Sequence, residues 1–237
     1  MYDAIESTFG DIETKSGSPE WMSFVSSRAI LATTNNYVND INKLCLSQLP
    51  GEEIIIPSVD STVHPDDATN YPVEYINSLE TSGIPAHQLT LKKNAVLMLL
   101  RNLNIRGGLC NGTRLIIQEV INNRLIKATI ANGEHKGRIV LIPKIQTQPA
   151  DFNHFGFEWQ RIQFPVKLAF AMTIHKSQGQ TLEQVAVWLQ EPCFGHGQLY
   201  VAASRVGSPD KIKFFVKSKD GHPNFTTRNV VYEELLQ

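Results

Sequence analysis

Apolar residues are spaced first for a strand and then for a helix near the start of the chain. Residues 28–33 are apolar between Arg28 and Thr33, which is typical of a buried strand. A helix is predicted to follow, capped by the hydroxyl of Thr33 or Thr34 and ended by Pro50-Gly51. The residues of its apolar face are Val38, Ile41, Leu44, Cys45 and Leu49. This strand–helix unit indicates an α/β domain.

The segments on either side of this unit are polar. Residues 1–27 contain many polar residues with glycine and serine, and we interpret them as a linker or the tail of an upstream domain. Residues 57–70 are predicted to form a mobile loop, and residues 73–79 a short helix.

Short β-type runs occupy the middle of the chain. They are residues 88–92, 95–100, 114–120, 125–130 and 138–142. Asn111-Gly112 and Asn132-Gly133 are signals for tight hairpins, because both central positions of that turn need positive φ. Several short strands at this spacing predict a small β-barrel.

The α/β pattern resumes after a polar stretch at residues 146–163. Buried strands are predicted at residues 166–169 and 185–189, a helix at 197–205 and a further strand at 211–216. The architecture inferred from the pattern is an α/β domain that is split in sequence by a barrel.

The net charge of −1 hides an asymmetry along the chain. Residues 1–80 hold 13 acidic and 3 basic residues, whereas residues 91–144 hold 10 basic and 2 acidic residues. The basic segment is either a polyanion-binding surface or an ordinary solvated face, and charge alone favours neither.

Composition limits the class of protein. Hydrophobic residues make up 42% of the chain, enough for a buried core, and no run of eighteen apolar residues predicts a membrane span. The three cysteines, Cys45, Cys110 and Cys193, have the spacing of neither a zinc site nor a disulfide framework. We interpret them as reduced core thiols.

Residues 168–181 contain the most closely spaced group of candidate binding residues in the chain. An apolar strand leads into Thr173, His175, Lys176, Ser177 and Gln178, followed by glycine. Hydroxyl, amide and ammonium donors that converge in this way suit a phosphodiester backbone. A histidine satisfied at a helix start, beside a solvated lysine, explains the same residues without a ligand.

A second stretch, residues 197–206, has an apolar helical face that leaves Arg205 free to project. Taken alone, an arginine at a helix end is more often part of a surface ion pair than a catalytic group.

Together the two stretches resemble motifs five and six of superfamily-one helicases, specifically those of the petite-integration-frequency family, which includes the helicases of Helitron transposons. Residues 97–102 and 108–115 are similar to the barrel segment of that family, and residues 29–36, continuing to Asp40-Ile41-Asn42, to its motif four. The resemblance covers residues 20–217. Ala203 departs from the leucine that is frequent in the family.

The resemblance implies a RecA-like parallel-sheet domain at residues 28–90 and 164–220. It is interrupted by a Src-homology-3-like barrel at residues 91–163, between a linker (1–27) and a carboxy-terminal tail (221–237). It also implies the 5′-to-3′ direction, a monomer without membrane contact, and a nuclear or mitochondrial location.

The resemblance also assigns roles to residues. Thr173, His175, Lys176 and Ser177 would line a track for single-stranded DNA, and Thr34 and Asn35 would hold the next phosphate. Gln178, Gly179 and Gln180 would couple the track to the ATP cleft, where Arg205 would be the arginine finger. The basic residues of the barrel would guide the strand; they are Lys92, Lys93, Arg101, Arg106 and Arg114.

The chain has no Gly-Lys-Thr or Gly-Lys-Ser phosphate loop and no Asp-Glu pair for Mg²⁺ on a strand. We therefore expect a fragment whose ATP and Mg²⁺ are bound largely by an upstream RecA-like domain of the same polypeptide, and which alone hydrolyses no ATP. A stand-alone nucleic-acid-binding or docking module is the main alternative. A hydrolase using Ser177, His175 or Cys193 is disfavoured, because nothing orients a base or forms an oxyanion hole.

Overall fold

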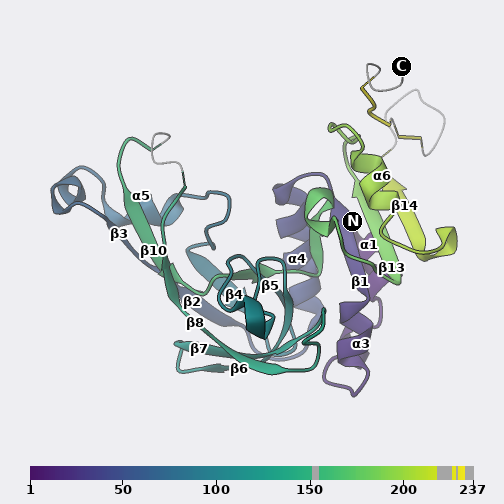
Figure 1. Cartoon of the computed structure of the whole chain (residues 1–237), viewed down its shortest axis with the longest axis horizontal. Helices are drawn as coiled ribbons and strands as arrows, with labels where there is room; N and C mark the ends of the chain where they lie inside the picture. The colour runs from purple at the N-terminus through teal and green to yellow at the C-terminus, as the bar shows by residue number, and fades with distance from the viewer. Residues whose placement is uncertain (151–154, 218–225, 228, 233–237) are drawn as a thin grey trace. The chain divides into compact units, whose positions relative to one another are not determined.

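The computed structural model describes residues 1–150, 155–217, 226–227 and 229–232. The chain forms two compact units (Figure 1): unit 1 comprises Met1–Pro50 and Leu168–Gln237, and unit 2 comprises Gly51–Lys167. Unit 2 interrupts unit 1 in sequence, as predicted, but it is longer than the predicted insertion. The reason is that residues 51–90 pair with strands of unit 2 and not with the parallel sheet of unit 1.

Unit 1 contains a four-stranded parallel sheet in the order β12-β1-β13-β14. Its strands are β1 (Arg28–Ala32), β12 (Ala171–Thr173), β13 (Gln184–Leu189) and β14 (Ile212–Val216). Ala29 to Ala32 are fully buried, in keeping with a strand covered on both faces. The parallel α/β sheet is confirmed. The strand predicted at residues 166–169 is β11 (Val166–Leu168) and belongs to a sheet of unit 2.

The predicted helix after β1 is α4 (Asn35–Gln48), which packs on β1 and β12. Val38, Ile41 and Cys45 are buried as expected, and Leu44 is only half-buried. Thr34 occupies the N-cap position, but its side chain makes no capping hydrogen bond. The helix predicted at residues 197–205 is α6 (Gln198–Ala203). Two 3₁₀ helices also belong to unit 1: η3 (Ile174–Ser177) directly follows β12, and η4 (Pro209–Lys211) directly precedes β14.

Residues 1–27 differ from the predicted linker. They form α1 (Tyr2–Phe9), α2 (Ile12–Lys15) and α3 (Trp21–Ser26). Ala4, Ile5 and Phe9 are fully or almost fully buried, and α1 packs on β1 and β13. A few apolar residues at helical spacing therefore outweigh the polar composition of this segment.

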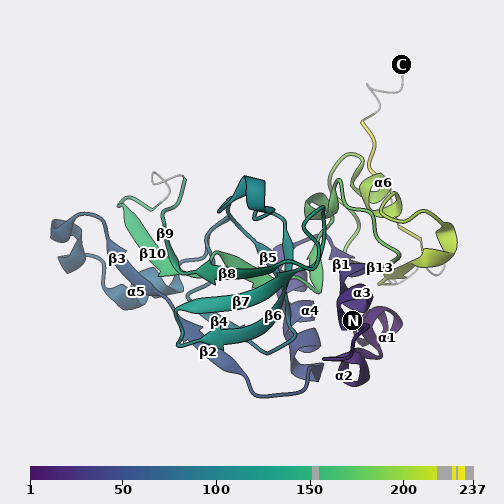
Figure 2. The same ribbon diagram turned by 60° about the horizontal axis from the view of Figure 1, so that its bottom comes forward.

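Unit 2 contains a five-stranded sheet in the order β11-β5-β6-β7-β8. Besides β11, its strands are β5 (Val96–Leu99), β6 (Arg114–Ile121), β7 (Leu125–Ile130) and β8 (Ile139–Pro143). β5 to β8 form an antiparallel series, of which β6, β7 and β8 lie side by side in Figure 2. The predicted short strands are confirmed, whereas the Src-homology-3-like closure stays a prediction.

Neither predicted Asn-Gly pair forms a tight hairpin, because Asn132-Gly133 lies in the eight-residue connection between the antiparallel strands β7 and β8. β5 and β6 are separated by residues 100–113, which include the 3₁₀ turn η2 (Ile105–Gly107), so Asn111-Gly112 is part of a longer connection. A tighter hairpin connection is formed by residues 122–124, between β6 and β7, in which Asn122 and Asn123 have φ of 50° and 54°. Asparagine tolerates this left-handed conformation better than other residues that carry a Cβ.

Two smaller sheets complete unit 2. β2 (Ile54–Pro57) pairs with β4 (Gln88–Leu91), and β10 (Trp159–Gln163) lies between β3 (Val59–Thr62) and β9 (Ile145–Thr147). The mobile loop predicted at residues 57–70 is wrong, because this stretch contains β3 and the 3₁₀ helix η1 (Pro65–Thr69). The short helix predicted next is α5 (Val73–Ser78). A local core of Ile76, Ile84, Phe157 and Trp159 covers it.

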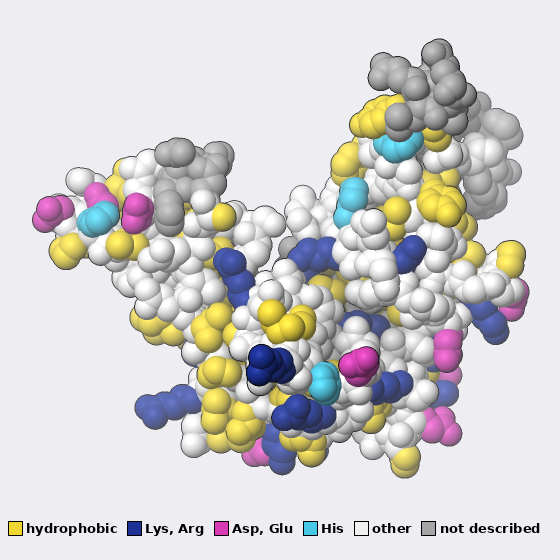
Figure 3. Space-filling model, in the orientation of Figure 1, with side chains coloured by type: hydrophobic (Ala, Val, Ile, Leu, Met, Phe, Trp, Pro, Cys, Tyr) yellow, Lys and Arg dark blue, Asp and Glu magenta, His cyan; other side chains and the backbone are white. Residues whose placement is uncertain are grey.

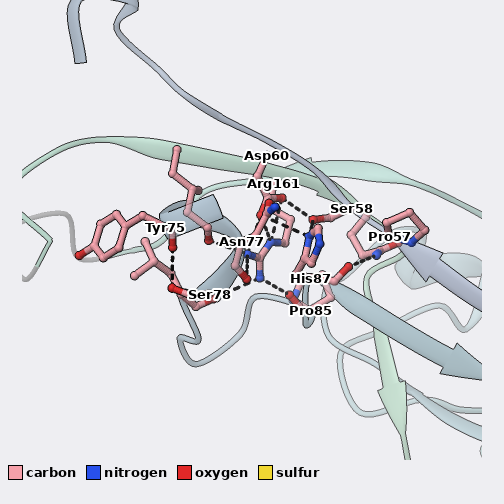
Figure 4. A network of polar contacts seen from close by, with 12 residues as sticks. Pro57, Ser58, Asp60, Tyr75, Asn77, Ser78, Pro85, His87 and Arg161 are labelled. Atoms are coloured by element: carbon pink, nitrogen blue, oxygen red, sulfur yellow. Dashed lines mark hydrogen bonds and ion pairs between the residues drawn. The ribbon is translucent and has the colours of Figure 1, made fainter. Parts of the chain in front are cut away.

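A buried ion pair joins these elements (Figure 4). Arg161 on β10 donates from Nη2 to Asp60 Oδ2 on β3 at 2.7 Å. Its Nε also donates to the Asp60 carboxylate, at 3.0 Å from both oxygens. Nη2 donates in addition to Ile76 O at 3.0 Å, and Nη1 donates to Pro85 O at 3.0 Å. The same carboxylate accepts from Ser58 Oγ, which lies 2.8 Å from His87 Nδ1. Because both charges are paired and hydrogen-bonded, this network fixes α5 on the sheet.

Candidate single-strand interface and its link to Arg205

The register of the parallel sheet brings two distant segments of unit 1 to one edge. Ala32, at the end of β1, pairs with Thr173, at the end of β12. The carboxyl ends of parallel strands lie at the same edge of a sheet, so the residues that follow both strands meet there. Thr34 and Asn35 follow β1, and His175 and Lys176 follow β12.

The predicted contact residues differ in exposure. Asn35, His175 and Lys176 are exposed, and Thr34 and Thr173 are half-buried. The chain therefore offers an amide, an imidazole and an ammonium group at this edge, a donor set suited to phosphate oxygens.

Ser177 corrects one expectation. Its side chain is 0% exposed, and its hydroxyl donates to Ile174 O at 2.7 Å. The hydroxyl closes its own 3₁₀ turn and does not line the surface. Sequence spacing did not reveal this, because a serine beside an exposed lysine can point either way.

Asn42 is a buried polar residue beside the candidate site that the site prediction did not include. It is buried on α4; its Nδ2 donates to Ala171 O at 3.1 Å and Leu168 O at 3.3 Å, and its Oδ1 accepts from Ala171 N at 2.9 Å. Both main-chain groups of Ala171 are thereby tied to the helix that carries Asn35. The available signal was a polar residue at a position on the apolar face of the predicted helix.

Arg205 joins the two motif stretches. Its Nη1 donates to Ser177 O and Gln180 O, both at 3.1 Å, and its Nε to Val201 O at 2.8 Å. Its Nη2 donates to Ser204 Oγ at 2.7 Å. Arg205 is half-buried. Two of these four bonds, both from Nη1, hold the loop that follows η3, and the other two reach Val201 and Ser204.

The predicted coupling residues form this loop. Gln178 and Gly179 are exposed, and Gln180 is half-buried with its Nε2 3.3 Å from Lys176 O. Gly179 has φ of +79°, a conformation that favours glycine. Arg205 and Lys176 are thus connected through one short segment.

The basic residues of unit 2 only partly match the predicted guide. Arg114 is 1% exposed, and burial lowers the pKa of its guanidinium to about 10, so it is a core residue. Lys92 is buried near Glu53, and Arg101 is half-buried. The exposed basic residues are Lys93, Arg106, Arg124, Lys136 and Arg138.

Charge is segregated within unit 2. No lysine or arginine occurs from residue 44 to residue 91. The arm made of β3, η1 and α5 carries acidic side chains, which are magenta in Figure 3. A polyanion would therefore be repelled by the arm and attracted to the segment that begins at Lys92.

The described residues contain neither a membrane-spanning helix nor a cluster of metal ligands. No helix among them is long and apolar enough to cross a membrane. In the same part of the chain, no three His, Cys, Asp or Glu side chains come together as metal ligands.

Unit 1 is a parallel α/β domain of the RecA-like class, interrupted in sequence by an antiparallel β unit and with polar loops at one edge of its sheet. The model of the Pif1 DNA helicase 2B domain matches residues 74–120, within unit 2. The ATP-dependent DNA helicase PIF1 of Xenopus laevis is 33% identical over 177 residues, covering 74% of this chain and 25% of the relative. Human PIF1 is 32% identical, with coverage of 75% and 25%.

The Pif1 helicase of Candida albicans superposes with a TM-score of 0.61 at 26% identity, covering 81% of this chain and 46% of that structure. The chain spans about a quarter of the vertebrate relatives and about half of this solved structure. In sequence and fold it corresponds to the carboxy-terminal part of Pif1-type DNA helicases, and the resemblance expected from the motifs is confirmed.

Proposed function

We propose that the chain is the carboxy-terminal motor half of an ATP-dependent, 5′-to-3′ DNA helicase. The observation that carries the proposal is the register of β1 and β12, which gathers the exposed donors Asn35, His175 and Lys176 at one sheet edge. A Bacteroides Pif1 solved with bound single-stranded DNA shares the fold, with a TM-score of 0.56 at 22% identity.

The strand-binding part of the proposal is tested with the chain itself. Lys176→Ala is expected to weaken binding of a fluorescent thymidine strand and to reduce the salt slope of the affinity by about 0.7, the value for one phosphate contact on a single strand. Lys211→Ala is the matched control, because Lys211 is an exposed lysine of the same unit that lies next to Asp210 at the opposite end of the sheet. Equal slopes in the wild type and Lys176→Ala would remove Lys176 from the track.

The nucleotide part concerns Arg205. ATP supplies the phosphoryl group; an upstream RecA-like domain of the same polypeptide is proposed to hold the phosphates and Mg²⁺, since the phosphate-loop motif is not in this sequence. Arg205 contributes positive charge where negative charge develops during hydrolysis. Its Nη2 edge, which donates to Ser204 Oγ, is the part proposed to face the γ-phosphate.

The same arginine also orders residues 177–180, which gives the coupling residues Gln178, Gly179 and Gln180 a physical role. A shift of the guanidinium towards a phosphate would alter its bonds to Ser177 O and Gln180 O, and so the loop beside Lys176. We propose this as the route between the cleft and the track.

The test uses the enzyme with both motor domains. Arg205→Ala is expected to lower kcat for ATP by about 10³-fold or more while DNA affinity changes little. Arg205→Lys separates charge from loop anchoring, because one ammonium group cannot replace three donor nitrogens. Near-normal hydrolysis in both variants would refute the role of Arg205 as an arginine finger.

A location in the nucleus or a mitochondrion is proposed from the resemblance alone.

A further inference from the structure

A third loop reaches the same edge of the parallel sheet. β13 lies next to β1 and runs parallel to it, so the loop at residues 190–197 starts at the edge where Thr34 and His175 lie. The loop contains Phe194, which is 66% exposed although its neighbour Cys193 is buried. A Cβ built on Gly195 would lie 3.9 Å from His175 Nε2, so the backbone next to Phe194 borders the imidazole.

The loop is anchored from two directions. Gln198, itself 1% exposed, accepts at Oε1 from Phe194 N at 3.1 Å and from Gly195 N at 3.3 Å. Beyond it, Gly197 N donates to Val230 O at 3.1 Å. Phe194 is therefore presented on fixed backbone, which reduces the entropy lost when a ligand binds it.

Two buried polar atoms at this edge have no hydrogen-bond partner among the described residues. They are Gln198 Nε2, on the amide that holds Phe194, and Thr33 Oγ1, directly after β1. Unsatisfied buried polar groups are unfavourable and rare. Acceptor atoms of a bound nucleotide would supply the missing partner of the Gln198 amide.

These observations favour a nucleobase as the occupant of the Phe194 surface. The neighbouring donors suit phosphates, so a bound strand brings its bases within reach of the same edge. Every base has a flat π face that stacks on an aromatic ring regardless of sequence. An isolated exposed phenylalanine needs no function, but Phe194 combines exposure, two anchoring hydrogen bonds and a border with His175.

We propose that Phe194 is a base-stacking platform of the single-strand track and that Gln198 is its positioning residue. The inference rests on the proposed function and adds a contact to bases where the other predicted residues contact the backbone. It implies that the track distinguishes a strand with bases from one without them, while remaining tolerant of sequence.

The experiment measures binding of the full chain to two fluorescent strands by anisotropy. One is a thymidine strand of about 15 nucleotides, and the other has the same phosphates with abasic spacers in place of the nucleosides. Phe194→Ala is expected to weaken binding of the thymidine strand at least about fivefold and to change abasic binding less than about twofold. Phe194→Tyr should keep the preference of the wild type for the thymidine strand over the abasic strand, and Gln198→Ala should reduce it.

Phe214→Ala is the matched control, because Phe214 is another exposed phenylalanine of unit 1, in the middle of β14. It should change neither affinity. Lys176→Ala should weaken both strands alike. If Phe194→Ala weakens binding of the two strands equally, or of neither, the inference is overturned. In that case, weaker binding in Lys176→Ala would still support the proposed function. If the wild-type chain binds neither strand, the proposed function fails and the inference fails with it.

Discussion

Adjacent residues of one motif have opposite surroundings. Lys176 is exposed, whereas the hydroxyl of Ser177 is used within its own turn. Ser177→Ala is therefore expected to lower the free energy of unfolding by about 1 kcal/mol, the usual net value of such a hydrogen bond, and to leave single-strand affinity unchanged. Lys176→Ala should weaken single-strand binding and leave the free energy of unfolding unchanged. Urea unfolding and fluorescence anisotropy measure the stability and the single-strand affinity of both variants. Weaker binding by Ser177→Ala with unchanged stability would indicate that the hydroxyl contacts the strand.

The cysteines also differ in their environments. Burial raises the pKa of the Cys45 and Cys193 thiols, whereas Cys110 is half-exposed. Because the thiolate is the reactive form, a disulfide reagent at pH 8 should label Cys110 rapidly in the folded chain and the other two only after unfolding. Rates followed by mass spectrometry check this. Rapid labelling of Cys45 in the folded chain would contradict its place in the core.

At the scale of elements, Asn42 joins α4 to β12. Asn42→Leu leaves Ala171 N, Ala171 O and Leu168 O without that partner, and each unsatisfied buried group costs about 1–3 kcal/mol. We expect the free energy of unfolding, measured with urea, to fall by at least about 2 kcal/mol. Single-strand binding should also weaken, because the two loops lose their alignment. Asn39→Ala, at an exposed position of the same helix, is the control and should change neither property.

The ion pair of Arg161 and Asp60 joins three elements of unit 2. Arg161→Leu leaves a buried carboxylate without its partner and is expected to cost about 3–5 kcal/mol of stability. Adding Asp60→Asn removes that charge and should recover part of the loss. Thermal unfolding of the single and double variants measures the difference; a double variant no more stable than Arg161→Leu would show that the lost main-chain contacts dominate.

The elements that the sequence predicted well are those whose burial matches their periodicity. The strand at Arg28–Ala32 is apolar after its first residue, and α4 repeats its apolar residues at helical spacing. Prediction failed where a few residues decide the outcome. Ile5 and Phe9 anchor α1 within a polar segment, and a tight hairpin turn contains Asn122-Asn123 and not an Asn-Gly pair. Arg114 and Ser177 failed for a different reason, because the direction of a polar side chain depends on tertiary packing.

At the scale of the whole molecule, the insertion can be removed to separate two contributions to DNA binding. Asn42 Nδ2 lies 3.3 Å from Leu168 O, and α4 ends at Gln48, about 9 Å further along the helix at 1.5 Å per residue. A Gly/Ser linker of about six residues can therefore join Pro50 to Leu168 in place of unit 2. Because unit 1 has its own sheet and core, the shortened chain is expected to unfold cooperatively.

The shortened chain retains Asn35, His175 and Lys176 and loses the exposed basic residues of unit 2. It should still bind single-stranded DNA, but with lower affinity and a smaller salt slope, because fewer counterions are released. Circular dichroism establishes the fold before anisotropy is measured over a range of salt. An unchanged slope would mean that the basic residues of unit 2 do not contact the strand. A folded chain that no longer binds would place the interface in unit 2 and contradict the role given to the sheet edge.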